Sequence, residues 1–241
     1  MIRYKTWMFK YLIFILFLSL QGMNSYSQDT AGIIQYAQNK VIPPGLKTNV
    51  LKALSFYPEL KTTNIRFILK PNIKNSVMQA QPVFRTLLRS KKNRHYRINI
   101  STYFKLISTQ MPIDSIPAEV MIGWIGHELG HILDYEQKSG SELAYFGYRY
   151  VVSPTYVKHA EMIADTLAVE RGMGKYIVAT KRFILDHAEL PQAYKDKIAR
   201  LYLSPDIILE QVKKLEEKKL LEQQLEAEKL QEKNVSEEKL F

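Results

Sequence analysis

Residues 118–133 of this 241-residue chain read AEVMIGWIGHELGHIL, a run that is apolar on nearly every side. Such a run is typical of a helix buried in a protein core, and Pro117 suits its first turn. Two histidines and a glutamate within it, His127, His131 and Glu128, would be costly to bury without partners. A metal ion would be such a partner, so the stretch predicts a core helix that carries a metal site.

The spacing of these three residues is that of the H-E-x-x-H motif. His127 and His131 are four positions apart, so on a helix they share a face and both rings can reach one tetrahedral ion. Glu128 lies about 100° further round the helix. It can therefore miss the metal and still reach a water molecule beside it, where a general base is needed.

A second helix is predicted from Ser153 to Gly172. Ser153 is a good N-cap, Pro154 suits the first position, and Gly172 suits the end. Glu161 and Asp165 interrupt its apolar stripe, and either carboxylate can supply a further ligand. The alternative is a surface helix with ordinary acidic residues, or a histidine pair satisfied by hydrogen bonds in the core.

Together the two motifs, H-E-x-x-H at 127–131 and E-x-x-A-D at 161–165, resemble the signature of the gluzincin metallopeptidases. The resemblance covers about residues 117–172. It implies that His127, His131 and Glu161 bind Zn²⁺, and that Asp165 holds His127 through its other ring nitrogen. His159 is the next candidate ligand if Glu161 is not one.

The same resemblance implies an α+β, helix-rich zincin-like domain with a small β-sheet over the zinc-binding helix. It also implies a residue that stabilises the oxyanion of the tetrahedral intermediate. The spacing singles none out; the candidates are His187, Arg182, Tyr148 and Tyr156. His95, in a basic turn, is expected to be solvated.

The start of the chain has the pattern of a signal peptide. A basic segment precedes the ten-residue apolar core 11–20, which is short for a membrane span. Ser25 and Ser27 favour cleavage before Gln28, so we expect a 1–27 signal peptide and an exported protein, periplasmic, envelope-associated or secreted. The alternative is an uncleaved N-terminal membrane anchor. The absence of cysteine excludes disulfides and thiolate zinc ligands.

The remaining chain divides by charge into a basic body, 28–204, and an acidic tail, 205–241. The tail begins with Ser204-Pro205-Asp206, a good helix start, and continues without glycine or proline. Its leucines keep no single heptad phase, so a long, charged, partly solvated helix is expected and a regular coiled coil is not. The basic body suggests an acidic substrate or an anionic envelope surface; with a signal peptide present, nucleic acid is not expected.

The segment between the signal peptide and the motif helix has mixed patterns. Short helices are predicted over 30–40 and 49–56, and a strand over 64–69. Two further runs, 83–88 and 96–101, alternate around a polar turn and predict a hairpin. The basic cluster Arg85 to Arg97 is then a solvated hairpin turn, and 96–101 is a possible edge strand that binds extended substrate.

Three glycines of the motif helix, Gly123, Gly126 and Gly130, follow i, i+3, i+7 spacing. Each costs about 1 kcal/mol relative to alanine in a helix. We therefore expect the sheet or the second ligand helix to pack very close to this stripe.

These patterns favour an exported zinc metallopeptidase, a hydrolase that cleaves peptide bonds of a polypeptide substrate through a zinc-activated water, with Glu128 as general base. The alternative is an exported zinc-binding scaffold or partner-binding module without proteolytic activity. A structural zinc site fills all four positions with protein, whereas this motif supplies three ligands and a base. The oligomeric state has no signal in the sequence.

Overall fold

The computed structural model describes residues 32–71, 73, 76–105, 109–186 and 190–238, with side chains described as far as 231. The expected signal peptide, its cleavage before Gln28 and the alternative anchor lie outside the described residues, as does His187. None of the described helices combines the length and apolar character that a membrane crossing needs.

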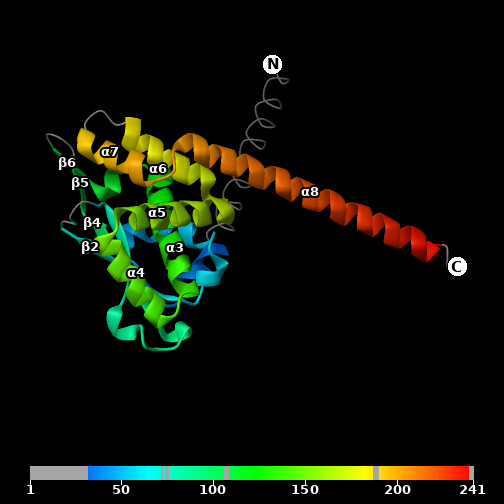
Figure 1. Ribbon diagram of the computed structural model, residues 1–241, viewed down its shortest axis with the longest axis horizontal. Coiled ribbons are helices and arrows are strands. Elements are labelled where there is room, and N and C mark those ends of the chain that lie inside the picture. The colour runs from blue at the N-terminus through cyan, green and yellow to red at the C-terminus, as the bar shows by residue number, and fades with distance from the viewer. Residues whose placement is uncertain (1–31, 72, 74–75, 106–108, 187–189, 239–241) are drawn as a thin grey trace, which may run out of the picture.

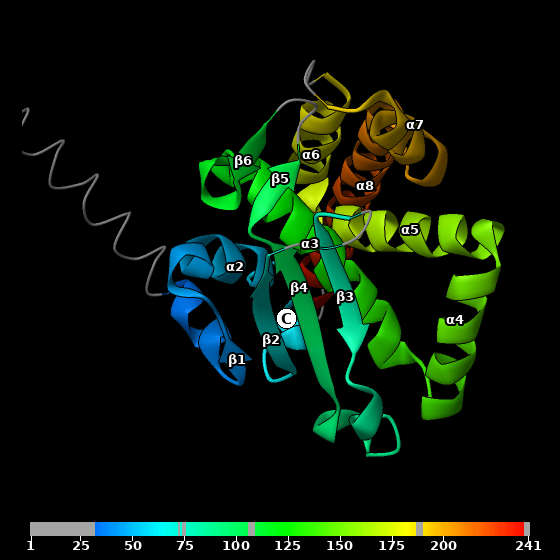
Figure 2. The ribbon, with the colours of Figure 1, turned by 90° about the vertical axis from the view of Figure 1, so that its left-hand side faces the viewer.

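The sheet has four strands in the order β1-β2-β4-β3 (Figure 2). Their bounds are Lys40–Val41, Asn64–Lys70, His95–Ser101 and Met78–Pro82 for β1, β2, β4 and β3. β1, β2 and β4 are parallel, and β3 is antiparallel to β4. A separate two-stranded sheet pairs β5, Tyr103–Lys105, with β6, Gln110–Pro112. The architecture is therefore α+β and helix-rich, as expected.

The prediction of the 64–69 strand is confirmed by β2, but the predicted hairpin is wrong in its first strand. Residues 84–86 form a 3-10 turn, and the strand that pairs with β4 is Met78–Pro82. The Thr86 hydroxyl donates to Val83 O (2.7 Å) and accepts from His95 N (3.1 Å), which holds the backbone coiled where extended structure was expected. β4 lies between β2 and β3, so 96–101 is not an edge and β3 is.

The first two predicted helices are only partly correct. α2, Lys47–Leu54, confirms the helix predicted over 49–56. Of the helix predicted over 30–40, the described part is helical only over 32–37, where it ends in the 3-10 turn Gln35–Ala37, and Lys40 already belongs to β1. Asn39 has a positive φ of 58°, which ends helical structure before β1.

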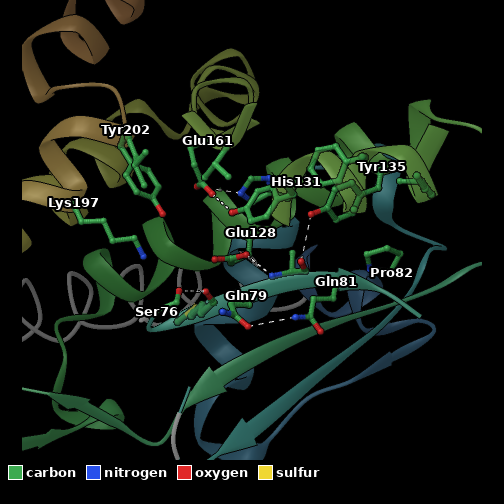
Figure 3. Close-up of a pocket in the computed structure, with 18 residues that line it drawn as sticks. Ser76, Gln79, Gln81, Pro82, Glu128, His131, Tyr135, Glu161, Lys197 and Tyr202 are labelled. Atoms are coloured by element: carbon green, nitrogen blue, oxygen red, sulfur yellow. Dashed lines mark hydrogen bonds and ion pairs between the residues drawn. The ribbon is translucent and has the colours of Figure 1, made fainter. Parts of the chain in front are cut away.

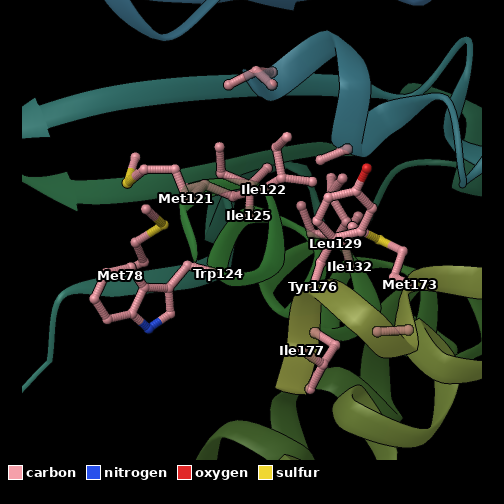
Figure 4. Close-up of a cluster of buried hydrophobic side chains, with 14 of the residues drawn as sticks. Met78, Met121, Ile122, Trp124, Ile125, Leu129, Ile132, Met173, Tyr176 and Ile177 are labelled. Carbon is pink, nitrogen blue, oxygen red and sulfur yellow. The ribbon is translucent and has the colours of Figure 1, made fainter. Parts of the chain in front are cut away.

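The predicted motif helix is α3, Ala118–Gln137, which lies at the centre of the protein (Figures 1 and 2). It packs on α2, the sheet, α5 and α6, and sixteen of its twenty residues are buried. Figure 4 shows its isoleucines and Leu129 beside Tyr176, Ile177 and Met173. The other helices are α4 (Gly140–Val152), α5 (Pro154–Ala168), α6 (Gly174–Asp186), α7 (Gln192–Leu201) and α8 (Pro205–Glu238).

The glycine stripe of α3 is a close-packing surface, as predicted. A Cβ at Gly123 would lie 2.2 Å from Tyr176 O of α6, and one at Gly130 would lie 2.6 Å from Ala164 O of α5. The stripe therefore lets the backbone of α3 approach both neighbouring helices, including the one that carries Glu161.

The tail is a single long helix, α8, that projects from the body (Figure 1). Ile208 is fully buried and Val212 packs against Gly174, whereas the described side chains beyond 216 are exposed. Its first two turns therefore belong to the packed structure.

Candidate metal centre

Side chains of α3 and α5 converge at one buried point. His127 Nε2 and His131 Nε2 lie 3.0 Å and 3.4 Å from the same oxygen, Glu161 Oε2. One ligand atom from each of the three residues lies within 4.8 Å of the others, and all three residues are buried. The close approach of α3 and α5 at Gly130 makes this convergence possible. The group could hold a metal ion.

Burial and the neighbouring charges have opposite effects on the pKa values of this group. Burial alone would lower the pKa of His127, but hydrogen bonds and charges of Asp165 and Glu161 outweigh it and raise that pKa to about 10. Burial alone would raise the pKa of Glu161, but the two histidines hold it well below the usual value. Two imidazoles and an ionised carboxylate form a donor set that suits zinc.

Asp165 lies behind His127, outside the three-residue group. Its Oδ1 lies 2.8 Å from His127 Nδ1, while Oδ2 accepts from Leu203 N (3.2 Å) and pairs with Lys181 Nζ (3.0 Å). His127 therefore presents Nε2 to Glu161, and its ring orientation is held through Nδ1. This is the placement that the resemblance implies for Asp165.

Three further residues, which the sequence analysis did not single out, lie around the candidate ligands: Tyr150, Tyr202 and Lys181. The Tyr150 hydroxyl of α4 donates to Glu161 Oε1. The Tyr202 ring lies 5.4 Å from the His127 ring and 4.0 Å from Lys181 Nζ. Two of these residues could have been found from helical spacing. Lys181 interrupts the apolar face of α6, and Tyr150 follows Leu143 and Phe146 on the buried face of α4, so each had a signal in the sequence. Tyr202 had none.

The Glu128 carboxylate lies between His131 and strand β3 of the sheet (Figure 3). Its Oε2 accepts from Ala80 N at 2.6 Å. Burial raises the pKa of Glu128, and the two histidines and this hydrogen bond only partly oppose that effect. A carboxylate with a raised pKa, next to a possible metal position, is a better proton acceptor than an ordinary carboxylate, as a general base must be.

The exposed edge of the sheet, strand β3, lies beside Glu128 and the candidate metal position. Val77 O and Val83 N bond to β4, so the N–H and C=O of Ala80, which alternates with them, point to the open edge. A cleft of about 360 Å³ lies between this edge and the helices. Its lining includes Glu128, His131, Glu161, Tyr150 and Tyr202.

The other predicted candidates lie elsewhere. His159, Arg182 and Tyr148 are exposed, and Tyr156 packs against Phe146. None of these four lines the cleft. His95 is half-buried and begins β4.

No known protein family, curated protein or solved structure matches this chain.

Proposed function

We propose that this protein is a zinc-dependent peptidase of the gluzincin type in which His127, His131 and Glu161 hold the ion and Glu128 is the general base. The observation that carries the proposal is the convergence of three buried ligand atoms beside a fourth ionisable group that is turned toward a cleft. Three protein ligands with an open position are typical of catalytic zinc, whereas structural zinc is enclosed by four.

A zinc ion in this site would supply Lewis acidity, which polarises a carbonyl and acidifies water. Glu128 would take the proton of the attacking water, since its buried carboxylate faces the cleft. Asp165 would hold the His127 ring through Nδ1, and Tyr150 would hold the Glu161 carboxylate through its second oxygen.

A polypeptide fits this cleft better than a small metabolite does, because one wall is an open strand edge. The N–H and C=O of Ala80 face this open edge, where an extended chain could add to β3; the C=O now accepts from the Tyr135 hydroxyl at 3.4 Å. Ala80 N now donates to Glu128, so the bound peptide would compete for that donor.

The test compares single changes at the site for zinc content and for hydrolysis of mixed unfolded polypeptides. Glu128→Gln should keep zinc and lower hydrolysis by about 10²–10⁴-fold, as loss of a general base does. His131→Ala and Glu161→Ala should lose zinc and hydrolysis together. Glu119→Gln, an exposed position in the first turn of the same helix, is the matched control and should change neither.

Full hydrolysis by Glu128→Gln would contradict the mechanism. Stoichiometric zinc without hydrolysis in the wild type would favour the binding-module alternative. Unchanged zinc in Glu161→Ala would remove Glu161 as the third ligand.

A further inference from the structure

The segment 83–94, which joins β3 to β4 and is here called the basic loop, carries two exposed apolar side chains. Phe84 is 79% exposed and Leu88 is 100% exposed. Leu87 N donates to Phe84 O and Arg89 N to Thr86 O, so the backbone is coiled there. Phe84 and Leu88 are exposed on either side of the buried Thr86 and Leu87, and the two exposed side chains are here called the apolar tip.

Buried side chains and hydrogen bonds to the C-terminal end of α3 fix the basic loop to the rest of the protein. Thr86 and Leu87 are buried, and the Arg94 guanidinium donates to Lys138 O at 2.6 Å. Lys91 Nζ donates to Gln137 O at 3.1 Å. The apolar tip is thus a preformed feature, and binding through it would require little further ordering.

The basic loop and the segments of the chain on either side of it are rich in cations. Residues 60–113 contain eleven Lys and Arg and no Asp or Glu. Arg85, Arg89 and Lys92 are exposed within the basic loop itself. A nearby acidic group from another element, Glu142, is the capping residue of α4 and accepts from Ser139 N.

We propose that the basic loop docks this protein on an anionic lipid bilayer, with Phe84 and Leu88 in the headgroup–acyl boundary and the arginines among the headgroups. Exposed apolar side chains in a loop that also carries exposed cations are the combination that interfacial segments use. Nucleic acid would satisfy the cations but would offer nothing to the aliphatic side chain of Leu88. The loop also forms the end of the molecule opposite α7 in both views, where a flat surface can reach it (Figures 1 and 2).

Docking in this way has a consequence for the cleft. β3 runs along the cleft and continues directly into the basic loop. The bilayer would therefore lie at one end of the open strand edge. Polypeptides at the membrane surface would then be the nearest substrates. This consequence for substrates rests on the proposed peptidase function, whereas the docking itself does not.

The test places a fluorescent reporter on the tip. The chain has no cysteine, so Leu88→Cys gives one labelling site for an environment-sensitive dye in the full chain. We expect a blue shift on addition of phosphatidylglycerol-containing vesicles and none with pure phosphatidylcholine. Val151→Cys, at an exposed apolar position of α4, is the matched control and should not respond. A dye at position 88 reports on the loop independently of the apolar N-terminal segment.

Adding Arg85→Gln and Arg89→Gln to the labelled protein should weaken the vesicle affinity by about 30-fold, roughly fivefold for each cation near an anionic surface. Lys158→Gln with Arg200→Gln, two exposed cations outside the loop, should leave it unchanged. The proposal is overturned if the position-88 dye ignores anionic vesicles, if position 151 responds equally, or if the dye responds to an oligonucleotide and not to vesicles.

Discussion

Lys181 is a buried cation that faces a fully buried carboxylate. Its Nζ lies 3.0 Å from Asp165 Oδ2, and the Tyr202 ring lies 4.0 Å away on another side. Burial alone would raise the pKa of Asp165, but Lys181 and His127 hold that pKa below its usual value. The ionised form of Asp165, and with it the orientation of His127, therefore depends on a residue that touches no proposed ligand atom.

We predict that Lys181→Met lowers the free energy of unfolding by about 3–5 kcal/mol, because it removes the lysine partner of a buried charge that only His127 would then offset. Adding Asp165→Asn to Lys181→Met should restore part of that loss, since the buried charge is then gone. Lys175→Met, an exposed position on the same helix that loses only a cation–π contact with the Tyr176 ring, is the control and should change stability by no more than about 1 kcal/mol. Denaturant unfolding measures all four proteins; equal losses for Lys181→Met and Lys175→Met would show that the pair contributes nothing.

Among the helices, the contact between α3 and α5 decides whether the ligands meet. A methyl group at Gly130 would lie 2.6 Å from Ala164 O, a backbone atom that cannot rotate away. The two helices would have to move apart, and Glu161 would move with α5 away from His131.

Gly130→Ala should therefore lower stability by about 1–3 kcal/mol despite the higher helix propensity of alanine. It should also weaken zinc affinity. Gly147→Ala in α4 meets no atom within 4 Å and should instead stabilise the protein, by up to about 1 kcal/mol. Thermal unfolding and zinc titration of the two variants give the comparison. A stabilised Gly130→Ala with normal zinc binding would mean that the helices tolerate a wider spacing.

The packed first turns of α8 should contribute to the stability of the protein, and its projecting part should not. Ile208 is fully buried against the body, whereas Leu220 is 57% exposed on the projecting part. Ile208→Ala should cost about 2–5 kcal/mol, the range for removing a buried aliphatic side chain. A chain that ends at Lys214 keeps this packed turn and should unfold at nearly the full-length temperature. Loss of zinc binding in the chain that ends at Lys214 would instead assign the projecting helix a part in the site.

The stability of the protein as a unit should depend on pH and on metal together. Without metal, His127 has a folded-state pKa of about 10 against an ordinary 6.5, so its contribution to stability is fully present below about pH 6.5 and is lost as the pH rises through 10. Glu161 and Asp165 have lowered pKa values, so their contributions are present above the ordinary values of 4.5 and 3.8 and are lost as the pH falls below them.

Zinc needs His127 without that proton, so its stabilising effect should grow with pH. We expect the difference in unfolding temperature between zinc-loaded and chelator-treated protein to be larger at pH 8.5 than at pH 6.5. His127→Gln should remove the difference at both. This assignment would be contradicted if the stability of the metal-free protein rose steadily from pH 7 to 10 and rose by the same amount in His127→Gln.

Features that depend on neighbours along the chain could be predicted from the sequence. Helical spacing placed His127 and His131 on one face, put Glu161 and Asp165 on the inner side of a second helix, and identified the long tail helix. The glycine stripe indicated a close neighbour, although it did not say which. These predictions succeeded because periodicity reports which side of an element is buried without reference to its partners.

Features that depend on distant partners were settled only by the tertiary structure. Met78–Pro82 has a weak strand pattern, and it becomes the edge of the sheet because β4 pairs with it on one side while α3 packs against it. The more regular run 83–88 is coiled instead, since Thr86 bonds to the backbone on both sides of the turn. Lys181, Tyr150 and Tyr202 reach the candidate metal centre from three separate elements. A sequence shows which groups would be costly to bury alone, but their partners are chosen by packing between segments far apart in the chain.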